Sequence, residues 1–358
     1  IIVNQHYGNR GVLPMDSFHF FDSGYRVLNG DLPFIDYWSV RGPLLDYMQA
    51  IFFYIFGVNW QSYVLHASSI NALITISTFF VLKNFKLKTI YCFFYSLLFS
   101  ILAYPSSGTP FADQHSAFFS LLGIYSLLLA INNQRKLYWV LIPVFLGFAF
   151  LSKQVPAAYV ILFVGFILFL YSLINKKFDS IKYSFISSLF FIFLILIFGK
   201  SQGITLSSFF EQYIFYPQTV GAERFKNLNL TFEAVLGNFI LIYLAIAPLL
   251  YDSLKKIFYN KNYIKHNNFY VFLILTLLTL SLILHQLLTK NQTFIFFLIP
   301  ILAAFSQISI SDSKSKFKKP IYFIIILICF FATFKYHLRF NEGRKFHELK
   351  NVNFELAI

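Results

Sequence analysis

Long apolar segments, separated by short polar connections, extend through most of the chain. A helix that crosses the hydrocarbon core of a bilayer needs about 20 mainly apolar residues. The pattern therefore predicts an all-α integral membrane protein, a multi-pass bundle of ten spanning helices. We expect these spans near residues 61–82, 89–104, 114–131, 138–152, 155–174, 181–199, 234–251, 269–288, 292–310 and 320–334.

A shorter apolar segment precedes the first span. It reads GPLLDYMQAIFFYIFG at residues 42–57 and contains Asp46 and Gln49. A crossing helix would be longer and less polar. We therefore predict an external juxtamembrane helix that lies along the outer surface of the membrane.

The distribution of lysine and arginine predicts the orientation, because these residues are retained on the cytoplasmic side of short loops. One alternating set of connections holds Lys83, Lys86, Lys88, Arg135, Lys136, Lys176, Lys177, Lys182, Lys255, Lys256, Lys261, Lys265, Lys314, Lys316, Lys318 and Lys319. The opposite short connections hold Lys153 and Lys290. We therefore expect residues 1–60, 105–113, 200–233 and 335–358 to face the outside.

This topology predicts three regions along the chain. Residues 1–60 form an external loop with juxtamembrane helices, residues 61–334 form the transmembrane domain, and residues 335–358 begin an external C-terminal region. The chain starts without Met and stops within a polar segment. We expect it to be a fragment truncated at both ends.

The composition supports a membrane protein and argues against nucleic-acid binding. Hydrophobic residues make up 58% of the chain and charged residues 12%, outside the usual range of soluble domains. The net charge of +14 comes from short basic tracts between apolar segments. Nucleic-acid binding would need a basic face on a soluble domain. Membrane lipids are therefore the expected partners of these lysines, and no nucleic acid is expected.

An acidic external loop supplies the first candidate site. The stretch PMDSFHFFD contains Asp16 and His19, which would share one face of a helix. Such a pair could hold a proton donor, a metal ion or a substrate hydroxyl. The alternative is a solvated loop whose acids cap helices.

Two further candidates lie at the predicted outer ends of spans. Asp113 and His115, in GTPFADQHSAFF, stand where a span begins; Asp113 could cap that helix or project into an external cavity. Lys153, in FAFLSKQVPAAY, separates two apolar segments. It could extend its amine to the interface, but a lysine on this face opposes the charge bias and favours a functional role, with an anionic phosphate as its partner.

The order of these stretches resembles the C-type glycosyltransferases, specifically the protein O-mannosyltransferase and aminoarabinose transferase branch. The resemblance rests on MDSFHFFDSGYRVLNGDLPFIDYW, GPLLDYMQAIFFYIFG, PFADQHSAFF and FLSKQVPAAY, and covers roughly residues 14–175. The family's first essential acid matches Asp16, a second acid matches Asp113, and a basic residue matches Lys153. The later family motifs have only a weak counterpart in this chain, the stretch TKNQTFIFFLIPIL.

The resemblance implies a membrane enzyme that moves a sugar from a polyprenyl-phosphate donor to a hydroxyl of a lipid, glycan or protein acceptor. It would lie in the bacterial inner membrane with its active site facing the periplasm. Asp16 and Asp113 would be catalytic, with Asp16 as the base. The expected substrate-binding residues are Lys153, His19, Arg41, Arg224 and His115, and a divalent metal is neither required nor excluded.

A second class of function remains open from the sequence. A lipid-linked-sugar flippase or transporter would show ionisable residues at mid-membrane and matching internal repeats, and the sequence shows neither. An O-antigen polymerase or ligase would share the external acids.

Overall fold

The computed structural model describes residues 1–9, 18–104, 108–289, 295–311 and 318–344. These residues form helices and connecting loops, and within them strand pairing is limited to an isolated bridge between Pro33 and Tyr37. The all-α fold predicted from the sequence is confirmed.

Each of the ten predicted spans corresponds to a helix. They are α4 (Trp60–Asn84), α5 (Thr89–Leu102), α6 (Ala112–Asn133), α7 (Lys136–Ser152), α8 (Gln154–Asn175), α9 (Asp179–Ser201), α12 (Ile240–Tyr259), α13 (Asn267–Thr289), α14 (Leu298–Ser311) and α15 (Lys318–Arg344). Among the described residues, six of these helices are long and apolar enough to cross a membrane: α4, α6, α8, α9, α13 and α15. The chain is a multi-pass membrane protein.

Several predicted bounds differ from the structure; the span expected at 292–310, for example, becomes a helix at Leu298–Ser311. The expected span at 234–251 becomes a helix at Ile240–Tyr259, because a separate π-helical turn, η2 (Glu233–Gly237), occupies the start of that segment. The last helix, α15, continues to Arg344, past the expected end of the span at residue 334.

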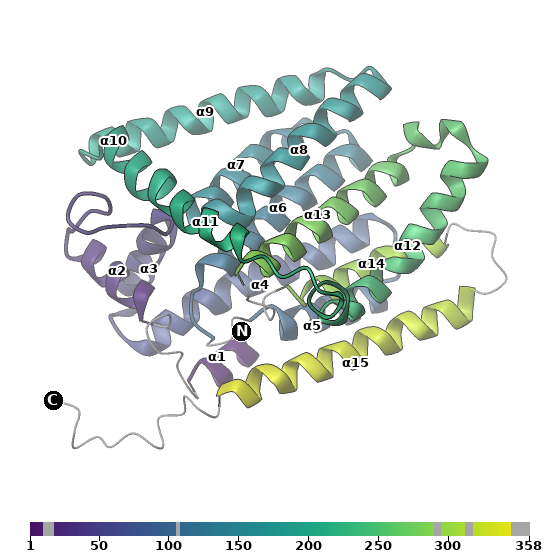
Figure 1. Cartoon of the computed structure of the whole chain (residues 1–358), viewed down its shortest axis with the longest axis horizontal. Coiled ribbons are helices and arrows are strands. Elements are labelled where there is room, and N and C mark those ends of the chain that lie inside the picture. Colours follow the sequence, from purple (N-terminus) through teal and green to yellow (C-terminus); the bar gives the residue numbers. More distant parts are fainter. Residues whose placement is uncertain (10–17, 105–107, 290–294, 312–317, 345–358) are drawn as a thin grey trace.

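The bundle is arranged around α6. This helix lies in the middle of Figure 1, and 94% of an apolar 18-residue stretch within it is buried inside the protein. Helix α9 lies along one edge of the bundle and α15 along the opposite edge. Only 11% and 28%, respectively, of the corresponding apolar stretches of these two helices are buried. Their exposed side chains are large and apolar, such as Phe190, Phe193 and Phe330, which suits contact with lipid chains.

Short helices gather at one end of the bundle. They are α1 (Ile2–Gly8), α2 (His19–Leu28), α3 (Pro43–Phe56), α10 (Leu206–Phe209), the π-helical turn η1 (Phe210–Phe215) and α11 (Tyr216–Lys226) (Figure 1). A 3-10 turn, η3 (Lys261–Lys265), lies between α12 and α13. The segment 42–57 forms a helix as predicted, and its placement on the membrane surface stays a prediction.

Candidate active site

Asp113 lies at the centre of a polar cluster formed by three helices. It occupies the first turn of α6, where an acidic side chain is favoured by the helix dipole. Its Oδ2 accepts a hydrogen bond from Lys153 Nζ at 2.6 Å, and its Oδ1 accepts one from His285 Nε2 at 2.6 Å. The structure thus brings together residues that are far apart in the sequence, and it shows that Asp113 does not cap its helix.

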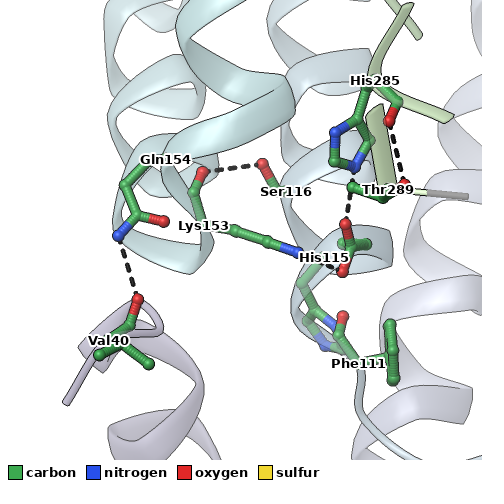
Figure 2. A network of polar contacts seen from close by, with 9 residues as sticks. Val40, Phe111, His115, Ser116, Lys153, Gln154, His285 and Thr289 are labelled. Atoms are coloured by element: carbon green, nitrogen blue, oxygen red, sulfur yellow. Dashed lines mark hydrogen bonds and ion pairs between the residues drawn. The ribbon is translucent and has the colours of Figure 1, made fainter. Parts of the chain in front are cut away.

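A break between α7 and α8 positions Lys153. Helix α7 ends at Ser152, Lys153 adopts an extended backbone, and α8 begins at Gln154. Ser116 Oγ donates a hydrogen bond to the carbonyl of Lys153 at 3.1 Å, which ties the break to α6 (Figure 2). The lysine side chain can therefore leave the line of the two helices and reach Asp113.

The loop before α3 holds this break from the other side. The amide of Gly42 donates to the carbonyl of Ser152 at 3.1 Å, and Gln154 Nε2 donates to the carbonyl of Val40 at 3.1 Å (Figure 2). A Cβ added at Gly42 would lie 1.7 Å from the carbonyl oxygen of Leu151. Only glycine allows so close an approach, so Gly42 secures the contact between this loop and the Lys153 break.

The surface segment at 206–226 also meets this break. Gln154 Nε2 donates to the carbonyl of Tyr213 at 2.5 Å, and the Tyr213 hydroxyl donates to the carbonyl of Phe150. Gln212 is buried as well, and it accepts from the amide of Ser39 at 2.9 Å. The segment is thus helical and anchored beside Lys153.

His285 completes the cluster from α13. A carboxylate accepts, so the Nε2 of His285 carries the proton in its bond to Asp113. The Nδ1 of His285 is buried and has no hydrogen-bond partner within the described part of the chain. His285 was not among the residues predicted for the site, because one histidine in an apolar helix carries no sign of a partner 172 positions away.

Access to the cluster is unequal. The side chain of Lys153 is 23% exposed, whereas those of Asp113 and His285 are 9% and 2% exposed. Charge-assisted hydrogen bonds such as these are shorter and stronger than neutral ones. Lys153 is therefore the most accessible member of the cluster; Asp113 holds its ammonium, and His285 holds Asp113.

A second polar group lies next to this cluster. His115 Nδ1 donates to the carbonyl of Phe111 at 3.0 Å, and His66 Nδ1 donates to Gln49 Oε1 at 2.9 Å. The two imidazole rings are 4.9 Å apart. His115 follows Asp113 closely in sequence but is engaged in this separate group (Figure 2). His66 and Gln49 were not predicted.

Of the other predicted residues, those that the structure describes lie around the same end of the bundle. Asp16 is outside the described residues. His19 begins α2, and its ring centroid is 4.9 Å from that of Phe20. Arg41 lies in the loop before α3, and its guanidinium carbon is 5.9 Å from the centre of the Phe20 ring. Arg224 is exposed on α11 and interacts electrostatically with His285.

A buried acid in α3 was not predicted as part of a site. Asp46 accepts from Ser23 Oγ at 2.6 Å and from the Tyr37 hydroxyl at 2.8 Å. Burial raises the pKa of Asp46 to about 7, although both hydrogen bonds oppose that shift. The sequence signal was available, because Asp46 and Gln49 are three residues apart and share the buried face of α3.

A metal site is not formed by the described residues. Among them, no group of three or more histidine, cysteine or acidic side chains lies close enough to bind a metal ion. Both oxygens of Asp113 are already engaged by Lys153 and His285.

Two comparisons show which known proteins this chain is similar to. The sequence profile of the dolichyl-phosphate-mannose-protein mannosyltransferase family matches residues 40–199. The fold is similar to the apo crystal structure of ArnT from Cupriavidus metallidurans, with a TM-score of 0.55 and 15% sequence identity. That match covers 87% of this chain and 58% of the ArnT chain. A comparison with curated proteins finds no significant match.

These matches support the resemblance to the C-type glycosyltransferases of the mannosyltransferase and ArnT-like branch: part of the sequence is similar to the mannosyltransferase family, and the fold is similar to that of ArnT. The chain spans a little over half the length of the ArnT structure that it resembles. The family profile includes the Asp113, Lys153 and Gly42 positions, whereas His285 lies outside it.

Proposed function

We propose that this protein is a membrane glycosyltransferase that moves a sugar from a polyprenyl-phosphate donor to an acceptor hydroxyl. The acceptor would be a lipid, a glycan or a protein. The protein would lie in a bacterial inner membrane, with residues 1–60 and the cluster of Asp113, Lys153 and His285 on the periplasmic side. The family match over residues 40–199 and the ArnT-like fold support this class of reaction.

The ion pair between Lys153 and Asp113 is the observation that carries the proposal. It lies at the end of the bundle where α1, α2, α3 and α11 gather, and Lys153 is its more exposed member (Figure 1). Buried charges need partners to be tolerated, and Asp113 supplies that partner to Lys153 at the break between α7 and α8. Binding of an anionic donor gives this arrangement a use.

The proposed reaction needs a cation at the phosphate and a base at the acceptor. The bond between the anomeric carbon and the phosphate oxygen breaks, and its electron pair leaves with the lipid phosphate. The acceptor oxygen bonds to the anomeric carbon and loses its proton to the base. The Lys153 ammonium would stabilise the charge that develops on the phosphate. Arg224 and Arg41 would add positive charge around it.

Asp16 is the proposed base, and Asp113 is proposed to assist by holding Lys153 and His285 in position. His19 begins α2, three positions after Asp16 in the sequence. It would contact the sugar or the acceptor from that side. His115, buried next to His66, would support the wall of the same site.

The test is transfer by membranes that contain the protein. They are incubated with a panel of polyprenyl-phosphate sugars, and the products are identified by mass spectrometry. We expect a glycosylated product and free polyprenyl phosphate, both lost in Asp16→Asn and strongly reduced in Lys153→Ala. Full transfer by both variants would overturn the residue assignments, and donor movement across the membrane without a product would favour a flippase.

A further inference from the structure

A basic cavity lies at the opposite end of the bundle from Asp113. Its volume is about 450 Å³, and its walls come from the ends of α6 and α8 and the starts of α7 and α9. Three lysines line it, Lys136, Lys176 and Lys177, with Asp179 as the one acidic side chain of the lining. The cavity therefore carries a net positive charge. It lies at the connections 134–136 and 176–182, which the lysine distribution predicts to be on the cytoplasmic side.

The walls of this cavity are held together by hydrogen bonds. Ser184 Oγ donates to the carbonyl of Trp139 at 3.0 Å, which joins α9 to α7. Ser180 Oγ donates to the carbonyl of Lys177 at 2.6 Å and fixes the turn between α8 and α9. Lys177 Nζ donates to Gln134 Oε1 at 3.0 Å across the cavity. The cavity is thus part of the folded bundle.

The cavity adjoins an exposed apolar surface of α9. Trp139 and Tyr183 line it, and aromatic side chains of this kind are enriched where a membrane meets water. Beyond Tyr183, on the same face of α9, Phe190, Leu194 and Ile197 are exposed. A lipid whose chains lie on this face of α9 would bring its head group to the lysines. Basic pockets between helices on the cytoplasmic side are suited to anionic head groups.

We infer that this cavity binds the phosphate head group of an anionic phospholipid from the cytoplasmic leaflet. The lysines would neutralise the phosphate, the aromatic rings would flank the glycerol region, and α9 would carry the acyl chains. This site is separate from the proposed transfer site and does not depend on the proposed reaction.

The experiment uses the purified full chain in detergent with three probes: phosphatidylglycerol, phosphatidylcholine and inorganic phosphate. Bound lipid is counted by native mass spectrometry, and the shift in unfolding temperature is measured for each probe. The test variant carries Lys136→Gln, Lys176→Gln and Lys177→Gln. Glutamine keeps an N–H donor for Gln134 while it removes the charge. The control carries Lys255→Gln, Lys261→Gln and Lys265→Gln, which removes the same charge from exposed lysines outside the cavity at the same end of the bundle.

We expect the parent and the control to retain phosphatidylglycerol, and the cavity variant to bind it at least about tenfold more weakly. Phosphatidylcholine should bind all three proteins equally and weakly. A comparable shift with inorganic phosphate, lost in the cavity variant, would identify a soluble phosphate as the ligand and overturn the lipid assignment. Equal losses in the two variants, with unfolding temperatures unchanged in the absence of lipid, would overturn the site.

Discussion

Removing the amine of Lys153 should damage both the fold and the proposed activity. Lys153→Ala leaves Asp113, which is 9% exposed, with His285 as its remaining charge-assisted donor. Breaking one side of a buried pair costs about 3–5 kcal/mol. The 23% exposure of Lys153 lets water replace part of the lost interaction, so we expect about 3 kcal/mol. That is a large share of a typical total stability of about 5–15 kcal/mol.

The chain contains a matched control for this experiment. Lys256 donates to Asp252 at 2.7 Å, the side chains are 27% and 9% exposed, and Ser309 is a second donor to Asp252 at 2.5 Å. This pair has nearly the same geometry and burial as the pair of Lys153 and Asp113, but it lies near the other end of the bundle. Lys256→Ala should therefore destabilise the fold by a similar amount.

The two variants should differ in sugar transfer. Loss of a group that stabilises developing charge lowers a rate by about 10²–10³. Transfer per folded molecule should fall by that factor in Lys153→Ala and stay near the parent level in Lys256→Ala. The assay combines unfolding in detergent with product formation from a polyprenyl-phosphate sugar, normalised to folded protein. Equal activity in the two variants would refute the role of Lys153 in the reaction.

Three further predictions concern single positions. His285→Ala should lower transfer by about tenfold or more in the same assay, while His285→Gln, which keeps a donor for Asp113, should recover much of it; equal losses would contradict a positioning role. Gly42→Ala should destabilise the fold by more than about 1 kcal/mol in thermal unfolding, because its Cβ would meet the Leu151 carbonyl. Gly165 has open space around it, so Gly165→Ala should be neutral or stabilise the fold by up to about 1 kcal/mol in the same measurement. The raised pKa of Asp46, about 7, means that the folded state binds its proton more tightly than the unfolded state, so unfolding in detergent should show stability falling as pH rises from about 4 to about 7. Asp46→Asn should flatten that dependence, and an unchanged pH profile would contradict burial of this carboxyl.

The membrane fold could be predicted from the sequence because it depends on local composition. A run of about 20 apolar residues specifies a spanning helix wherever it occurs. The break at Lys153 was visible for the same reason, since a charged residue interrupts an apolar pattern. The start of α12 was misplaced because the apolar run begins in a separate π-helical turn at Glu233–Gly237.

The candidate site could be predicted only in part, because it depends on pairings across the bundle. Asp113 and Lys153 stood out as charges at the ends of apolar segments, and the structure joins them directly. His285 and His66 are single polar residues in apolar helices, and their partners become apparent only when the helices are packed. Asp46 was seen as a polar position in a short helix, but its burial depends on the contact between α2 and α3.

Product analysis with defined donors tests the central claim most directly. Membranes that contain the parent protein, or the Asp16→Asn and Lys153→Ala variants, are supplied with single polyprenyl-phosphate sugars, and both the glycosylated acceptor and the released polyprenyl phosphate are measured by mass spectrometry. We predict that both products form together with the parent protein and that both are lost or reduced at least about a hundredfold in the variants. Absence of both products with every donor, from protein shown to be folded, would contradict the proposed transfer reaction.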